Sequence, residues 1–189
     1  MPGRLSVIFD KNQTAVEDRY TCIASCGYAG DQLVDAEHYP IFNGSVHVAD
    51  EEGLARIMEC PNGIDARGQF HALAFQESMK RGLSTQRISM TDEASIHQFG
   101  ARKVKIYNDK PSTRKPRTYL GYIIGIAGEV RKLKNSQGAR IFGVFATPEN
   151  NSAHADIFVV ASVDEGDKLA VQHMFHRVFK ISSLVPPTA

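Results

Sequence analysis

The 189-residue chain is poor in the features that assign a protein to a class at first sight. Its three cysteines, Cys22, Cys26 and Cys60, are an odd set with one CxxxC spacing and no second pair, which does not fit a structural zinc site. We interpret them as reduced, buried thiols. No stretch approaches the roughly 20 apolar residues of a membrane span, and the N-terminus has no signal-peptide pattern. We therefore expect a soluble, cytoplasmic protein without a membrane partner.

Charge of neither sign dominates, because 22 Lys and Arg stand against 21 Asp and Glu. This balance argues against a dedicated nucleic-acid coat, so any charged partner must be met by a local patch. The P-loop, GxGxxG and GxSxG motifs are absent, which disfavours the common nucleotide hydrolases and serine hydrolases. The sequence predicts no metal site and no cofactor.

The length fits one domain, which we place at residues 1–185, with a short tail at 186–189. Strand composition is found in LSVIF, YTCIASCGYAG, SVHVA, FHALAF, STQRISM, YLGYIIGIAGEV, ARIFGVFA and ADIFVVASV. Helices are predicted at about 51–59, from Thr91 to a stop at Gly100, and in DKLAVQHMFHRVFK.

The predicted fold is a single α+β domain with a mainly antiparallel sheet, short helices and a C-terminal helix packed on the sheet. FHALAF and STQRISM are expected to form a hairpin. The last three apolar strands follow one another closely and are expected to lie side by side.

The stretch TPENNSAHADIF places His154 at the end of a polar loop, where an apolar strand is about to begin. Strand ends hold polar side chains rigidly within reach of a ligand. An imidazole there can act as an acid, a base or a phosphate donor, because its pKa is close to physiological pH. The alternative is a histidine that only satisfies loop carbonyls.

Two arginines are the other candidates for a catalytic site. Arg67 precedes the predicted strand that carries His71, and Arg87 lies in STQRISM with Ser84. Arginine offers a planar fork for phosphate or carboxylate, which a histidine can complement. We expect Arg67, Arg87 and His154 to converge as catalytic residues, with His71 and Ser84 as ligand-binding residues. Solvated arginines and a half-buried strand histidine are the alternative.

The segment ARKVKIYNDKPSTRKPRT carries seven basic residues, two prolines and one acid, without a regular period. We predict an exposed loop whose Lys103, Lys105, Arg114 and Lys115 bind a nucleic-acid backbone. A solubilising loop is the alternative. His173 and His176, three residues apart on the last helix, lack further ligands and indicate a solvated face rather than a metal site.

The order of Arg67 with HALAF, LSTQRISM, YIIGIAGEV and TPENNSAHADIF resembles that of a family of short uncharacterised bacterial proteins. The resemblance covers about residues 64–160 and brings no known activity. It implies that the residues at the family's recurring positions converge on one site; these are Arg67, Phe75, Ser84, Arg87 and His154. The chain departs from that family at His71 and Ala72, where serines are usual.

A weaker likeness concerns VHVADEEGLARIMECPNGIDARGQFHALAF, which is similar to part of the ADP-ribosyltransferase-like fold. It implies a nucleotide pocket with His47 and Arg67, although the glutamate of many such transferases has no counterpart. The resulting hypothesis is an enzyme directed at a nucleotide or nucleic acid, in a bacterial toxin, defence or mobile-element setting. The alternative hypothesis is a non-enzymatic module that recognises a protein or nucleic acid through the basic loop and C-terminal helix. Oligomeric state is not predicted.

Overall fold

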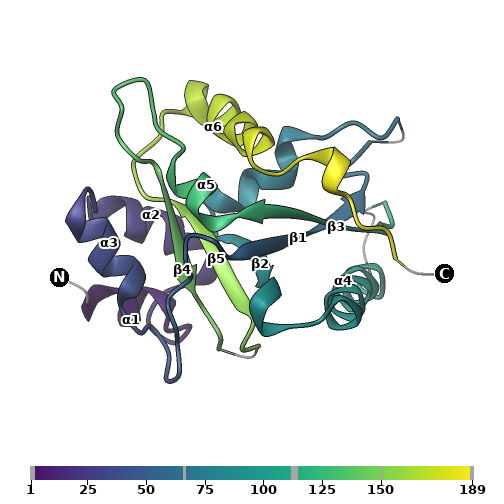
Figure 1. Cartoon of the computed structure of the whole chain (residues 1–189), viewed down its shortest axis with the longest axis horizontal. Helices are drawn as coiled ribbons and strands as arrows, with labels where there is room; N and C mark the ends of the chain where they lie inside the picture. The colour runs from purple at the N-terminus through teal and green to yellow at the C-terminus, as the bar shows by residue number, and fades with distance from the viewer. Residues whose placement is uncertain (1–2, 66, 112–114, 150, 188–189) are drawn as a thin grey trace.

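The computed structural model describes residues 3–65, 67–111, 115–149 and 151–187, and these form an antiparallel sheet with helices on both faces (Figure 1). The five strands are β1 (Gly53–Cys60), β2 (Leu83–Arg87), β3 (Thr118–Ile126), β4 (Phe142–Ala146) and β5 (His154–Val159). Their order across the sheet is β3-β1-β2-β5-β4, and every neighbouring pair is antiparallel. The central strand is therefore β2.

Helices precede the first strand, follow the last one and lie in the connections from β1 to β2, β2 to β3 and β3 to β4. The α-helices are α1 (Gly3–Phe9), α2 (Arg19–Ser25), α3 (Asp31–His38), α4 (Glu93–Asn108), α5 (Ala127–Arg131) and α6 (Lys168–Met174). The short 3-10 helices are η1 (Val16–Asp18), η2 (Ala72–Met79), η3 (Ile88–Met90), η4 (Glu165–Asp167), η5 (Phe175–Arg177) and η6 (Ile181–Ser183). None of the helices in the described part of the chain is long and apolar enough to cross a membrane.

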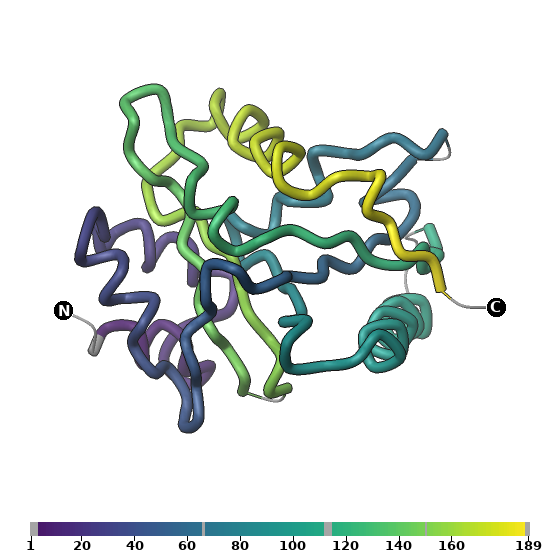
Figure 2. Tube along the Cα trace, in the orientation of Figure 1, coloured from purple at the N-terminus to yellow at the C-terminus, as the bar shows by residue number. Residues whose placement is uncertain are grey.

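The two faces of the sheet are covered differently. The main core lies on one face, where Phe75 of η2, Val130 of α5 and Phe175 of η5 pack against the strands. On the other face, helices α1 to α3 cover β4 and β5, whereas α4 covers β1 and β3. Figure 2 shows these two helical groups at opposite ends of the sheet. The second face is thus divided, with polar residues of β2 and β5 between the groups.

The α+β prediction with a C-terminal helix on the sheet is confirmed. Val171, Phe175 and Phe179 of the C-terminal segment are buried in the main core, as the helical spacing predicted. Gln172, a polar residue of the same helix, is also buried.

The predicted N-terminal strands are wrong, because LSVIF and YTCIASCGYAG lie largely in helices α1 and α2. Leu5, Ile8 and Phe9 are buried together, at the i, i+3, i+4 spacing of one helical face. Their β-branched and aromatic composition suggested strands, but burial against Phe145 and Phe158 of the sheet selects the helical period.

The helix predicted at 51–59 is also wrong, because this segment is β1. Leu54, Ile57 and Met58 are at helical spacing by coincidence. In β1 both faces are covered, so Ala55 and Arg56 are buried as well and the apolar pattern loses its period of two.

The hairpin of FHALAF and STQRISM is not formed. The first segment belongs mostly to η2, whereas the second supplies β2, which pairs with β1 and β5. The hairpin of β4 and β5 is formed, but β3 lies at the opposite edge from β4 and pairs with β1. The sequence order of the last three strands is therefore not their spatial order.

Helix α4 is longer than predicted and absorbs the first half of the expected basic loop. Asp92 caps it, since its carboxylate accepts a hydrogen bond of 2.7 Å from the Ser95 amide. Gly100, the expected stop, lies in mid-helix and is buried against the ring of Tyr119. The helix therefore continues through Lys103 and Lys105 to Asn108.

Candidate active site

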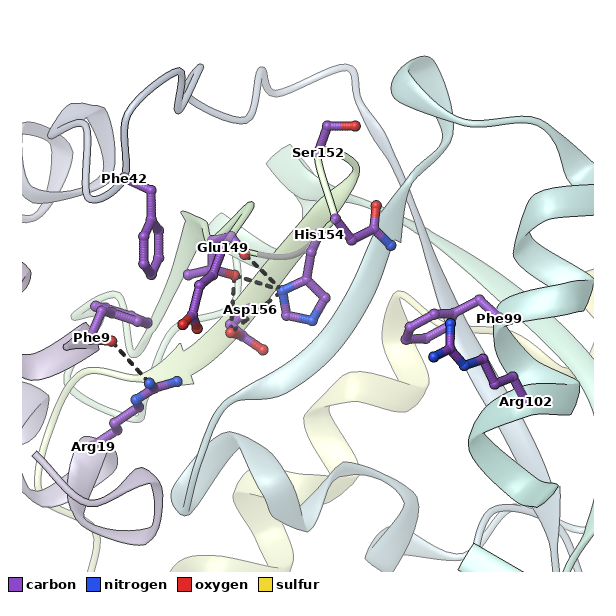
Figure 3. A pocket seen from close by; sticks show the side chains of 11 residues that line it. Phe9, Arg19, Phe42, Phe99, Arg102, Glu149, Ser152, His154 and Asp156 are labelled. Carbon is purple, nitrogen blue, oxygen red and sulfur yellow. Dashed lines mark hydrogen bonds and ion pairs between the residues drawn. The ribbon is translucent and has the colours of Figure 1, made fainter. Parts of the chain in front are cut away.

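A cavity of about 630 Å³ opens on the divided face of the sheet (Figure 3). Figure 3 shows Phe9, Arg19 and Phe42 on one side of His154, with Phe99 and Arg102 of α4 on the other. The β4–β5 hairpin and its loop supply the remaining lining residues, which are Thr147, Glu149, Asn151, Ser152, His154 and Asp156. The cavity thus has aromatic and basic walls around a polar floor.

Strand register brings polar side chains of β2 next to those of β5 on this floor, although the β2 residues do not themselves line the cavity. Ser84 of β2 is paired with Asp156 of β5, and Gln86 is paired with His154. Directly paired residues of antiparallel strands point to the same face. A serine, a histidine and an aspartate consequently meet on two neighbouring strands.

A continuous chain of hydrogen bonds links these residues. The Ser84 hydroxyl is 2.7 Å from Nε2 of His154, and Nδ1 of His154 is 2.9 Å from the Thr147 hydroxyl. Thr147 in turn donates to Oδ2 of Asp156 over 3.0 Å, while Nδ1 of His154 is 3.9 Å from the same oxygen. The order is Ser84, His154, Thr147, Asp156.

The partners of Nδ1 determine which nitrogen of His154 carries the proton in the neutral ring. The Thr147 carbonyl oxygen is 3.1 Å from Nδ1, and a carbonyl oxygen can only accept. The Thr147 hydroxyl already donates to Asp156, so it too accepts from Nδ1. Nδ1–H is therefore the donor, and Nε2 is left with a lone pair that accepts the Ser84 hydroxyl hydrogen. This is the arrangement of a base set to take a proton from serine.

Ser84 is open to solvent although it lies on the central strand. The other four residues of β2 are buried, and Ser84 is the partly exposed one. Thr147 and Asp156, each 5 % exposed, are almost completely buried behind the imidazole. Ser84 is thus the most exposed residue of β2, whereas the members of the hydrogen-bond chain that line the cavity itself are His154, Thr147 and Asp156.

The loop before β5 is held by Asn151. Its side-chain oxygen accepts from the Ala153 amide at 3.0 Å, its backbone carbonyl accepts from the His154 amide at 2.9 Å, and its side-chain amide donates to Gln86 at 2.6 Å. Asparagine suits this role because its side chain reproduces a turn of the backbone. The hydrogen bonds of Asn151 therefore hold the loop before β5 so that His154 has a fixed position at the cavity.

Arg19 and Arg102 face the cavity without a carboxylate partner in the described chain. Arg19 is 9 % exposed, donates to the Phe9 carbonyl at 3.0 Å and lies over the Phe9 ring, and its Nε has no hydrogen-bond partner. Arg102 is exposed on α4. Glu149 is paired with Lys11 at 3.2 Å. The two arginines can therefore hold an anionic group of a ligand.

The structure does not bring the three expected catalytic residues together. Arg67 lies in an exposed turn, 3.7 Å from Asp65, and does not line the cavity. Arg87 is buried on the opposite face of the sheet from His154, where it pairs with Glu52 at 2.7 Å and donates to the carbonyls of Val46 and His47. Of the three, His154 alone lines the cavity.

The expected ligand-binding residues are also dispersed. His71 is exposed before η2, whereas Ser84 contacts His154. Lys103 lines a second cavity, and Lys105 is exposed and paired with Asp109. Lys115 is exposed, and Arg114 lies outside the described residues.

The remaining histidines and the cysteines have other surroundings. His173 and His176 are in contact with each other, and His176 stacks on Phe70. No group of three or more histidines, cysteines and acids in the described chain is placed to hold a metal ion. Cys22, Cys26 and Cys60 are free and half-buried rather than buried.

Sequence reasoning missed Thr147, Asp156, Arg19 and Arg102. The His-x-Asp spacing of 154 and 156 at the start of an apolar strand was a usable signal, because it puts both side chains on one face. Arg19 left no such signal, since α2 reaches the cavity only through tertiary packing.

Comparison with known proteins identifies no relative: no family model, no curated protein and no solved structure matches the chain. The likenesses to a family of uncharacterised bacterial proteins and to the ADP-ribosyltransferase-like fold therefore remain expectations. The site has to be interpreted from its own geometry.

Proposed function

We propose that the protein is an enzyme that cleaves an ester or amide through Ser84 as nucleophile. The observation that carries this proposal is the 2.7 Å contact between the Ser84 hydroxyl and a His154 Nε2 whose lone pair is directed by the partners of Nδ1. A serine hydroxyl is a weak nucleophile until an adjacent base removes its proton. The GxSxG elbow is absent here, and a strand presents the serine instead.

The proposed reaction has two steps. Oγ of Ser84 attacks the carbonyl carbon of the substrate as its proton moves to Nε2 of His154, and the same proton then passes to the leaving group. Water next attacks the acyl-serine ester, loses a proton to Nε2 and releases the acid, which restores the hydroxyl. Thr147 and Asp156 hold the ring in its tautomer and stabilise the positive charge that it gains.

The walls of the cavity suggest the substrate class. Arg19 and Arg102 would hold a carboxylate or phosphate of the substrate, and the rings of Phe9, Phe42 and Phe99 would contact its apolar part. The earlier hypothesis of a nucleotide-directed enzyme is compatible with such an anionic group, but Arg67 and Arg87 have no part in this site.

A fluorophosphonate probe, which reacts with activated serine hydroxyls, tests the proposal directly. We expect the wild-type protein to acquire one adduct at Ser84, located by mass spectrometry of the peptide. Ser84→Ala should abolish labelling, and His154→Gln should slow it at least ~100-fold, the range of general-base catalysis. Ser152→Ala is the matched control, since Ser152 lines the cavity beside His154, whereas the serine hydroxyl that bonds the His154 ring is that of Ser84.

Melting temperatures of all variants accompany the labelling. If the folded wild type takes up no probe, or if Ser84→Ala is labelled as fast as the wild type, the nucleophile is wrongly assigned. A His154→Gln protein that labels normally but melts several degrees lower would show that the imidazole only supports the fold. That result would favour the non-enzymatic alternative.

A further inference from the structure

A second cavity, of about 560 Å³, lies beside the C-terminal half of α4 and outside the Ser84 site. Its lining comes from the turn before β2, from α4, from the residues that follow α4 and from the residue before β3. The lining residues are Arg81, Lys103, Ile106, Tyr107, Lys110, Pro111 and Arg117. Four of these seven side chains are cationic, and none is acidic.

Two carboxylates behind the lining offset only part of this charge. Glu77 is paired with both Arg56 and Arg81, and Glu59 is paired with Arg117. Glu17 and Asp156 also attract Arg81 from farther away. Lys103 and Lys110, by contrast, have no ion pair with a carboxylate in the described chain, so the lining keeps an excess of positive charge.

Arg117 is held in position by its neighbours. Its guanidinium lies 3.5 Å from the centre of the Tyr107 ring. The side chain of Asn108 bonds the backbone of Arg117 twice, as donor to its carbonyl at 2.9 Å and acceptor from its amide at 2.8 Å. Nε of Arg117 is buried without a hydrogen-bond partner. The cation is thus preorganised rather than free in solvent.

Lys103 is the cation whose partner is missing. Its side chain is half-buried on α4, and no carboxylate in the described chain lies within ion-pair distance, although Glu77 and Glu59 attract it from farther away. Burial, reinforced by the charge of Arg56, lowers the pKa of Lys103 to about 8. A bound anion would remove this penalty and keep the ammonium protonated.

We propose that this cavity binds the diphosphate or triphosphate group of a small molecule. Lysine and arginine are the residues that bind phosphate, the first as a point charge and the second as a fork. Four cationic side chains gathered around one cavity with no acidic lining residue match an anion that concentrates its charge. A nucleic-acid backbone instead spreads its charges along an extended surface. The site is independent of the chemistry proposed for Ser84.

Isothermal titration with sodium tripolyphosphate tests the site, with sulfate as the weakly charged comparison and a single-stranded oligoadenylate as the polymeric one. We expect tripolyphosphate to bind best. Lys103→Gln should weaken the affinity for tripolyphosphate at least tenfold. Lys105 lies on the same helix but is exposed and paired with Asp109, so Lys105→Gln removes the same charge and should change this affinity less than twofold. Lys110→Gln provides a second, exposed position in the cavity and should also weaken binding.

Dependence on pH separates Lys103 from general attraction. The groups that act on it are Arg56 and Glu59 of β1, Glu77 of η2, and Arg81. Because the pKa of Lys103 is about 8, its charge is lost as the pH rises from 7 to 9.5. The ratio of wild-type to Lys103→Gln affinity should therefore shrink over this range, while ionisation of the ligand affects both proteins equally.

Three results would overturn the proposal. The first is no binding of tripolyphosphate by the folded protein. The second is an equal loss in Lys103→Gln and Lys105→Gln, which would indicate non-specific attraction. The third is tighter binding of the oligoadenylate than of tripolyphosphate, which would make this face a nucleic-acid surface. Ser84→Ala should bind like the wild type, so failure of either proposal can be recognised separately.

Discussion

At the scale of single residues, the ion pair of Arg87 and Glu52 illustrates how a buried charge is tolerated. The two side chains are 6 % and 5 % exposed and share two hydrogen bonds, at 3.1 and 2.7 Å. Arg87 also donates to two backbone carbonyls of the segment before β1. With its donors occupied in this way, Arg87 supports the fold, whereas the exposed Arg67 does not.

Breaking this pair should be costly. Glu52→Gln leaves a buried guanidinium without its counter-charge, which destabilises proteins by about 3 to 5 kcal/mol. Urea unfolding is the measurement, and Asp109→Asn is the control, because an exposed pair contributes only about 0 to 1 kcal/mol. If Arg87 is structural, folded Glu52→Gln should still react with the fluorophosphonate probe at Ser84. A stable Glu52→Gln variant that no longer reacts with the probe would indicate that Arg87 contributes to the active site.

The stability that the Arg87–Glu52 pair contributes should depend on pH. Burial opposes ionisation of Glu52, but hydrogen bonds from Arg87 and Ser89 outweigh it and lower its pKa below the usual value. A carboxyl with a lowered pKa contributes stability above its unfolded pKa of about 4.3 and loses it as the pH falls. The difference in unfolding free energy between wild type and Glu52→Gln should therefore be constant near neutrality and shrink below about pH 4.

At the scale of elements, helix α4 forms one wall of the first cavity and supplies three of the seven residues that line the second, Lys103, Ile106 and Tyr107. It approaches the sheet at Gly100, where a Cβ atom would lie closer than 3.0 Å to ring atoms of Tyr119. The Tyr119 ring cannot swing away freely, because its hydroxyl is 2.8 Å from Nδ1 of His97. Close packing at this one position sets the separation of α4 from β3.

Gly100→Ala should consequently destabilise the protein although alanine is the better helix former. The gain in helix propensity is about 1 kcal/mol, whereas overpacking costs about 1 to 3 kcal/mol. We expect a net loss, seen as a lower urea midpoint. Gly166→Ala, where a Cβ would meet no atom within 4 Å, should change stability by less than ~0.5 kcal/mol. A Gly100→Ala protein that is more stable than the wild type would contradict the packing argument.

Elements were predictable where a segment shows a single apolar stripe or an uninterrupted apolar run such as FGVFA or IFVVA. The apolar stripe of the C-terminal helix and the apolar runs of β4 and β5 gave correct assignments. Prediction failed for β1, because cover on both faces removes its period, and for α1, whose β-branched residues obscure a helical spacing. Spatial order of the strands could not be read, since β3 and β4 follow each other in sequence and lie at opposite edges.

At the scale of the whole molecule, the first cavity arises because α1 to α3 and α4 cover different strands of the same face. The sequence indicated His154 and Ser84 as positions of interest, but it could not show that they touch. Their contact depends on the pairing of β2 with β5, which is specified by packing throughout the sheet. Arg19 and Arg102 enter the first cavity only because their helices flank it.

Ser84 and His154 are 70 residues apart in the sequence, so their contact reports a late stage of folding. The strand pair that joins them is the seam between the first and second halves of the sheet, and such non-local pairings form late because the intervening chain must first be closed into a loop. During refolding from urea, helical circular dichroism should recover before the probe begins to react at Ser84. The onset of labelling at Ser84 would then report the time at which β2 pairs with β5 during refolding.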